Sequence, residues 1–274
     1  MVCEALVTLM MRVPLTKMHG ARNDFLILDQ RVARLPDLAS FARWACDRHA
    51  GIGADGLIVL EPSDVAYVRM RTINADGGEA EMCGNGIRCA ARRLDEAGEG
   101  DRIPFETDAG VVRTEIVARE PEYSVRVAMG SPRIDLQPHS TLEGGAFVDL
   151  GNPHVVFFVS DVDGVDLERL ATRIQGNRRF SNGANVHIAA PIDTHSMRVR
   201  SWERGVGLTM ACGTGAVACA AAGIARNVAT SPVEVRVPGG RLVVEWDGEG
   251  DAALVGPAVR VFDTEVEVET RLLR

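Results

Sequence analysis

The 274 residues are 46% hydrophobic and 25% charged, the composition of a globular protein with one large domain or two of ordinary size. A net charge of −8 and a pI near 5.3 argue against nucleic acid or an acidic membrane surface as a partner, and no apolar run reaches the roughly 20 residues of a membrane helix. The six cysteines include no Cys-x-x-Cys pair and do not form a disulfide framework, so we expect a protein of the reducing cytoplasm.

The first residues are a poor signal peptide, because Glu4 interrupts the apolar stretch and no basic region precedes it. Met10 or Met11 is an alternative start, since the patterned chain begins near Leu15.

Alternating apolar residues predict strands, and apolar residues with a period of 3.6 predict helices. In the first half, strands are predicted at 15–20, 25–29, 57–60, 65–72, 105–107, 111–117 and 124–128, and helices at 37–46 and 87–98. In the second half, strands are predicted at 146–150, 155–159, 186–189, 197–202, 233–237 and 241–246, and helices at 167–176 and 216–226. The last alternating segment, 258–268, could cross back to the first half. Strands outnumber helices, so we expect an α+β fold in which curved mixed sheets or barrels wrap a central helix in each lobe.

One glycine motif suggests a different function. Residues 51–56 read Gly-Ile-Gly-Ala-Asp-Gly and match the dinucleotide-binding pattern Gly-x-Gly-x-x-Gly. That pattern follows a strand and opens a helix in a Rossmann unit, whereas here it follows a predicted helix and opens a predicted strand. The context therefore disfavours a dinucleotide site.

The chain contains a duplication. Cys83 and Cys212 each precede a Gly-x-Gly that opens a helix, and they are 129 positions apart, as are Asn23 and Asn152. A fixed period indicates a repeated structural unit. We therefore expect two pseudo-symmetric lobes with the active site in the cleft between them. The first spans 12–129, with 265–274 returning to it, and the second spans 130–264, because Gly-Ser-Pro at 130–132 breaks the pattern.

The two cysteines are the first candidates for chemistry. A thiol at a helix N-terminus lies near unpaired N–H groups that favour the thiolate and bind anions, so we expect a lowered thiol pKa. Nucleophilic catalysis would need one activated cysteine with a base, and a redox pair would usually be Cys-x-x-Cys. Two thiols on opposite lobes fit two-base proton transfer. Cys89 and Cys219, inside their helices, are expected to be small buried hydrophobes. Imine chemistry with pyridoxal phosphate would require Lys17, the only lysine.

Several motifs resemble the diaminopimelate epimerase family across 17–246. They are Lys17-Met18-His19-Gly20-x-x-Asn23-Asp24-Phe25, Asn74-Ala75-Asp76-Gly77, Met82-Cys83-Gly84-Asn85-Gly86-x-Arg88-Cys89, Gly151-Asn152-Pro153-His154, Glu203-Arg204-Gly205-x-Gly207 and Ala211-Cys212-Gly213-Thr214-Gly215. The resemblance implies a two-lobed, cofactor-independent and metal-free isomerase. Such an enzyme interconverts LL- and meso-diaminopimelate for lysine and peptidoglycan synthesis.

The resemblance also implies roles for individual residues. Cys83 and Cys212 would be the acid–base pair, with His154 and Glu203 tuning the thiols and holding the reacting amino group. The residues implied to bind substrate are Asn23, Asn74, Gly84, Asn85, Asn152, Asn185, Glu203, Arg204, Gly213 and Thr214. An Arg fork suits a second carboxylate, and amides suit a zwitterion.

Three departures from the family pattern leave room for a shifted specificity. Gly56 stands where some members have Gln, Arg22 replaces a usual Gly, and Leu208 replaces a frequent Glu. The alternatives are a racemase of the same fold acting on histidine or a proline derivative, a redox-sensing thiol protein, and a non-catalytic amino-acid-binding module. We expect a homodimer, which an exposed strand edge could support.

Overall fold

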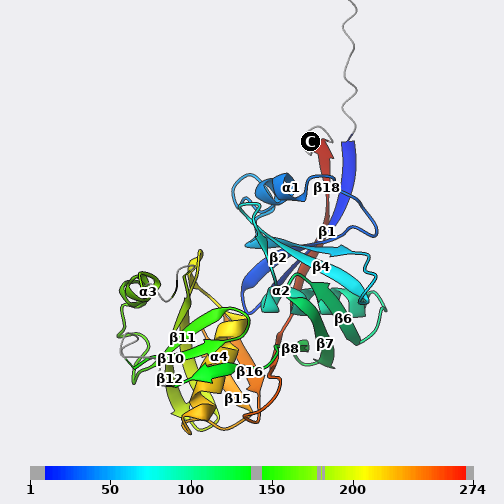
Figure 1. Cartoon of the computed structure of the whole chain (residues 1–274). Coiled ribbons are helices and arrows are strands. Elements are labelled where there is room, and N and C mark those ends of the chain that lie inside the picture. The colour runs from blue at the N-terminus through cyan, green and yellow to red at the C-terminus, as the bar shows by residue number, and fades with distance from the viewer. Residues whose placement is uncertain (1–9, 137–143, 178–179, 181–182, 270–274) are drawn as a thin grey trace, which may run out of the picture.

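The computed structural model describes residues 10–136, 144–177, 180 and 183–269, in which the elements form two groups (Figure 1). The helices are α1 (Leu38–Ala45), α2 (Gly84–Glu96), α3 (Leu167–Gln175) and α4 (Gly213–Ala225). The strands before residue 130 are β1 (Met10–Gly20), β2 (Asn23–Asp29), β3 (Gly56–Glu61), β4 (Val68–Asn74), β5 (Glu79–Ala80), β6 (Arg102–Thr107), β7 (Gly110–Ala118) and β8 (Ser124–Ala128). The later strands are β9 (Arg133–Asp135), β10 (Ala146–Asp149), β11 (Pro153–Phe158), β12 (Asn185–Asp193), β13 (Ser196–Glu203), β14 (Gly207–Thr209), β15 (Val233–Val237), β16 (Gly240–Glu245), β17 (Ala253–Pro257) and β18 (Val259–Glu269).

The strand pairing repeats, and it confirms the predicted pseudo-symmetry. In the first half β2 and β3 are parallel, β3 and β4 antiparallel, and β4 and β6 parallel. In the second half β11 and β12, β12 and β13, and β13 and β15 follow the same order. Phe25 lies opposite Gly56, and His154 lies opposite Asn185. Both residues of the second pair stand 129 positions after those of the first, so the repeat holds at the level of register.

Among the described strands, two pairings join the halves. Strand β8 pairs antiparallel with β17, and β18 runs back along β1, with Val259 opposite His19 and Glu269 opposite Met10. The division at residues 129 and 130 stays a prediction, and 270–274 lie outside the described residues. Among the described residues, no helix is both long and apolar enough to cross a membrane.

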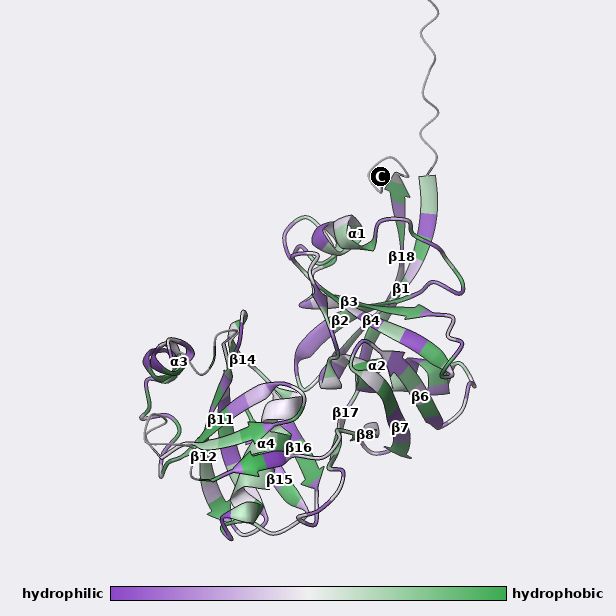
Figure 2. Cartoon of the chain, viewed as in Figure 1, coloured by the Kyte–Doolittle hydropathy of each residue, from purple (hydrophilic) through white to green (hydrophobic). Residues whose placement is uncertain are grey.

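The central helices α2 and α4 form the core with the strands around them (Figure 1). All side chains from Ala216 to Ala222 in α4 are buried, and their small size lets the surrounding strands approach closely. Helices α1 and α3 pack outside; Asp37 and Asp166 cap them by accepting bonds from Ser40 N and Arg169 N at 2.9 and 3.0 Å. Hydrophobic and hydrophilic residues interleave along the strands (Figure 2), as expected for half-buried sheets.

The glycine motif at 51–56 lies between a helix and a strand, in the order that the sequence predicted and that disfavours a dinucleotide site. It follows α1 and leads into β3. A Cβ on Gly51 would lie 2.2 Å from the Trp44 carbonyl oxygen, so the glycine permits close packing of the loop on α1.

Candidate active site

The N-termini of α2 and α4 meet. Cys83 and Cys212 are the N-cap residues of these helices and have extended backbones. A Cβ built on Gly84 would lie 3.8 Å from the Cα of Gly213. Beside this contact is a cavity of about 120 Å³. Its lining residues are Asn23, Met82, Cys83, Gly84, Asn85, Asn152, Glu203, Ala211, Cys212, Gly213 and Thr214.

Around Cys83 the hydrogen bonds connect the two cysteine loops. The Cys83 Sγ accepts a bond from Gly86 N at 3.4 Å, and the thiol donates to Asn23 Oδ1 at 3.8 Å. The Asn85 carboxamide donates to the same Asn23 oxygen at 3.0 Å and to the Ala211 carbonyl at 3.1 Å. Asn85 therefore ties the first loop to the residue before Cys212.

The thiols are less acidic than the sequence suggested. Burial raises the pKa of Cys83, although N–H groups of Gly86 and Asn85 and the charge of Arg88 act in the opposite direction. Burial also raises the pKa of Cys212 well above its usual range, and the neighbouring Glu203 carboxylate raises it further. The prediction of lowered thiol pKa values is therefore wrong, because loss of thiolate hydration outweighs the helix N-terminus.

A buried arginine holds the first loop. The Arg88 side chain is fully buried and donates to Gly84 O and Asn85 Oδ1, both at 2.9 Å, and to Pro257 O at 3.1 Å. Burial lowers the pKa of its guanidinium. A Cβ on Gly256 would lie 3.1 Å from the Arg88 Cζ, so that glycine leaves room for the side chain. Arg88 was not predicted to have a role, although its apolar neighbours on α2 indicated burial.

In the second half, four polar groups form a chain. Ser201 Oγ lies 2.8 Å from His187 Nδ1, His187 Nε2 lies 2.9 Å from His154 Nδ1, and His154 Nε2 lies 2.8 Å from Asn152 Oδ1. Both imidazoles are fully buried. Burial lowers the pKa of His187 to about 3 and that of His154 well below its usual value. His154 is thus neutral and lies behind Asn152, outside the cavity lining.

The other predicted binding residues divide into two groups. Asn23, Gly84, Asn85, Asn152, Glu203, Gly213 and Thr214 line the cavity, whereas Asn74, Asn185 and Arg204 do not. Asn185 is buried; its carboxamide donates to Pro153 O at 3.3 Å and accepts from Arg204 N at 3.0 Å. Asn74 and Arg204 are exposed.

Thr214 Oγ1 lies 3.7 Å from the Cys212 sulfur. Burial raises the pKa of Glu203. Met82 and Ala211 also line the cavity and were not predicted. Each precedes a cysteine, so the 129-residue repeat was the signal that could have identified them.

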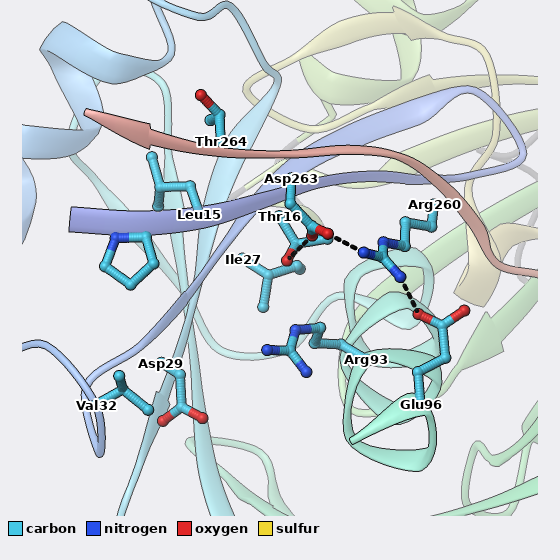
Figure 3. A pocket seen from close by; sticks show the side chains of 11 residues that line it. Leu15, Thr16, Ile27, Asp29, Val32, Arg93, Glu96, Arg260, Asp263 and Thr264 are labelled. Atoms are coloured by element: carbon cyan, nitrogen blue, oxygen red, sulfur yellow. Dashed lines mark hydrogen bonds and ion pairs between the residues drawn. The ribbon is translucent and has the colours of Figure 1, made fainter. Parts of the chain in front are cut away.

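A larger cavity, of about 370 Å³, lies between β1, β18 and the end of α2 (Figure 3). Across it Arg260 pairs with Asp263 and, at 3.5 Å, with Glu96, while Thr16 Oγ1 donates to Asp263 at 2.8 Å (Figure 3). Its lining contains no cysteine. The smaller cavity is therefore the better candidate for thiol chemistry.

The residues that line the small cavity include neither a set of metal ligands nor a lysine that could form an imine. In the described part of the chain, no three His, Cys, Asp or Glu side chains cluster as metal ligands would. Lys17 is buried and pairs with Asp24 at 2.5 Å and with the Gly53 carbonyl, so its ammonium group is already bound elsewhere.

Comparison with known sequences identifies a family. Residues 15–134 and 146–261 match the model described as diaminopimelate epimerase. The diaminopimelate epimerase of Sphingopyxis alaskensis is 43% identical over 263 residues, covering 92% of this chain and 96% of the relative. That of Moorella thermoacetica is 39% identical over 268 residues, covering 90% and 96%.

Solved structures of lower identity share the fold. A PhzF-family phenazine biosynthesis protein of Bacillus anthracis superposes with a TM-score of 0.74 at 19% identity, covering 93% of this chain and 99% of that one. A hydroxyproline epimerase of Agrobacterium vitis, solved with trans-4-hydroxy-L-proline, gives 0.68 at 16% identity, covering 94% and 92%. At these identities the likeness shows the fold alone.

Proposed function

The chain belongs to the diaminopimelate epimerase family and is an epimerase, and from this premise we propose that it interconverts LL- and meso-diaminopimelate by two-base proton transfer between Cys83 and Cys212. The observation that carries the proposal is the pair of N-cap thiols at two helix N-termini that meet beside one cavity. The reaction would serve lysine and peptidoglycan precursor synthesis.

The two helix N-termini would bind the α-carboxylate of the substrate. Backbone N–H groups in the first turn of a helix have no intrahelical partner, and they attract anions. Those of Gly84 and Asn85 belong to one helix, and those of Gly213 and Thr214 to the other. The same groups would stabilise the negative charge that spreads onto the carboxylate when the α-proton leaves.

Proton transfer then uses both thiols. One thiolate takes the α-proton, which breaks a C–H bond and forms an S–H bond, and the other thiol donates its proton to the opposite face of the carbanion. Each turnover exchanges the protonation states of the two cysteines, so the reverse reaction starts from the other form. The α-ammonium group of the bound substrate supplies the positive charge that favours a buried thiolate.

Glu203 makes the pair unequal. Its carboxylate raises the pKa of both thiols, but on Cys212 it acts through a hydrogen bond as well as through its charge, whereas at Cys83 the N–H groups of Gly86 and Asn85 and the charge of Arg88 oppose it. We assign Cys83 as the base and Cys212 as the acid in the direction that starts from the resting enzyme.

The distal amino-acid group would decide substrate choice. We assign its recognition to Arg204 with Asn74, Asn185 and the cavity asparagines Asn23 and Asn152. A site that pairs buried polar groups rejects analogues that lack them, by up to about 10⁴-fold. L-lysine, which lacks the distal carboxylate, is therefore expected to be a poor substrate.

A substrate panel tests this assignment. We expect kcat/KM for LL-diaminopimelate to exceed those for L-lysine, L-histidine and trans-4-hydroxy-L-proline by at least about 100-fold. Faster turnover of histidine or the proline derivative would show a different racemase of this fold. No turnover of any member would favour a redox or binding protein.

The remaining features proposed here are a cytoplasmic location, the absence of a cofactor and a homodimer. Among the described strands, β18 pairs only with β1, so its outer edge could pair with a second copy. Light scattering after size-exclusion chromatography would then give twice the chain mass of 29.5 kDa; a single-chain mass would contradict the dimer.

A further inference from the structure

The two halves of the molecule differ at three equivalent buried positions. Where the first half has Phe25, Ile58 and Thr72, the second half has His154, His187 and Ser201, each 129 positions later. The registers agree, because Ile58 lies opposite Thr72 and His187 lies opposite Ser201. All six side chains are buried. The second half thus has two imidazoles where the first half has two apolar side chains.

The polar atoms of the second half are paired, whereas the matching one in the first half is not. Within the described residues, Thr72 Oγ1 has no hydrogen-bond partner. Its counterpart Ser201 Oγ bonds to His187, which in turn bonds to His154. A buried histidine pair carries a desolvation cost that an apolar pair avoids, so its presence at these positions calls for a function.

The carboxamide oxygen of Asn152 faces His154 Nε2, and with this oxygen as the terminal acceptor the two neutral imidazoles have one consistent direction of donation. A neutral imidazole has one donor and one acceptor nitrogen. The Ser201 hydroxyl donates to His187 Nδ1, His187 Nε2–H donates to His154 Nδ1, and His154 Nε2–H donates to Asn152 Oδ1. Both rings then carry their proton on Nε2, and either ring in the other tautomer would place two acceptors or two donors face to face.

Packing holds His187 in place. A Cβ on Gly215, in the first turn of α4, would lie 2.3 Å from the His187 Cε1. The two imidazole rings stack with centroids 5.1 Å apart. In the first half Gly86 approaches Ile58 in the same way, with a Cβ that would lie 2.5 Å from its Cδ1. The helix that carries Cys212 therefore rests on the imidazole of His187.

We propose that His187, backed by Ser201, is a positioning residue that fixes the tautomer of His154 and so keeps the NH₂ group of Asn152 available to a substrate carboxylate. Asn152 lines the cavity, and its oxygen is occupied by His154, so its nitrogen is the atom left for a ligand. The substrate part of this inference rests on the proposed function.

The equivalent asparagine of the first half is held differently. The Asn23 nitrogen donates to Asp55 Oδ2 at 2.7 Å, and its oxygen accepts from Asn85 and Cys83. Both polar atoms of the Asn23 carboxamide thus have partners within the protein, with its oxygen next to one thiol, whereas Asn152 keeps an NH₂ group for the cavity. The relay makes the two halves of a pseudo-symmetric site chemically distinct, as a zwitterionic substrate requires.

The first test reads the tautomers directly and needs no activity. Long-range ¹H–¹⁵N NMR of protein with ¹⁵N-labelled histidine is expected to show His154 and His187 as neutral Nε2–H tautomers that do not titrate between pH 5.5 and 9. Nδ1–H forms at both rings would reverse the chain and present the Asn152 oxygen to the cavity, and an Nδ1–H form at one ring would break the chain; either result would overturn the proposal.

The second test converts the relay into its first-half counterpart. His187→Ile reproduces the residue that Ile58 places under Gly86, and it is expected to raise KM for LL-diaminopimelate about 10- to 100-fold, the range for losing a hydrogen bond to a charged group. The kcat value should change much less, since Asn152 contacts the carboxylate before and during proton transfer. His195→Ala, at an exposed histidine, is the matched control.

A KM within about twofold of wild type in folded His187→Ile would refute the positioning role. If that variant does not fold, Ser201→Ala retains both rings, and the proposal requires a raised KM together with a changed tautomer signal. Wild-type protein that shows the Nε2–H tautomers but no turnover of diaminopimelate would contradict the proposed function and leave the relay established.

Discussion

Arg88→Met tests how a buried cation supports the first cysteine loop. The substitution removes three hydrogen bonds, to Gly84 O, Asn85 Oδ1 and Pro257 O, at a side chain with no exposed surface. Each acceptor left buried and unpaired costs about 1–3 kcal/mol, while the variant gains from no longer desolvating a charge. Gly84 O keeps its bond from the backbone N–H of residue 88 within α2, so two acceptors lose their donor, and we expect the free energy of unfolding to fall by about 2–3 kcal/mol.

Urea denaturation measures this change through the midpoint and the slope. Arg93→Met on the same helix is the control, because the Arg93 guanidinium makes no hydrogen bond to another described residue. Arg88→Met should also raise the pKa of Cys83, since the Arg88 charge favours that thiolate. Alkylation of Cys83 by iodoacetamide at fixed pH should therefore be slower in Arg88→Met than in the wild type. A loss no larger than that of the control would refute the view that Arg88 satisfies these oxygens.

Three further predictions concern the buried histidines, Glu203 and Cys219. Burial lowers the pKa of His154 and His187 below the unfolded value of 6.5, so the unfolded chain takes up protons first as the pH falls. The folded state is therefore expected to lose stability from pH 6.5 toward pH 3, by about 2 kcal/mol per histidine at pH 5. A free energy of unfolding that does not change with pH in this range would contradict the prediction. Glu203→Gln should lower the pH of half-maximal alkylation of Cys212, because the carboxylate opposes its ionisation; an upward shift would reverse that assignment. Cys219→Ala should retain activity within a few-fold of wild type, and a loss above about 100-fold would give this cysteine a catalytic role.

Local patterns predicted most of the fold. Short runs of consecutive residues indicate the N-cap cysteines and the central helices, and a fixed spacing indicates the 129-residue repeat. Strand β17 was not predicted, because Gly256 and Pro257 obscure its pattern; it pairs with β16, the preceding strand, and also with β8 from the other half. Such a contact has no local signal.

The site was less predictable where a property depends on burial or on a partner that is distant in the sequence. The sequence placed Cys83 at a helix N-terminus but could not show that desolvation would outweigh that effect. The role of Gly86 and Gly215 was also not visible in the sequence, because each lets its helix pack on a distant side chain, Ile58 or His187. The repeat offset, applied to Ile58, was the one signal that could have identified His187.

Deuterium incorporation tests the central proposal of two thiols acting on opposite faces. LL-diaminopimelate is incubated in D₂O with the wild type, with Cys83→Ala and with Cys212→Ala, and the α-positions are followed by NMR. We predict that wild-type product carries deuterium at the inverted carbon while unreacted substrate at early times carries none, and that each variant loses at least about 100-fold of epimerisation. Inverted product that keeps its original α-hydrogen, or a variant that retains more than about a tenth of the wild-type rate, would contradict two-base catalysis by Cys83 and Cys212.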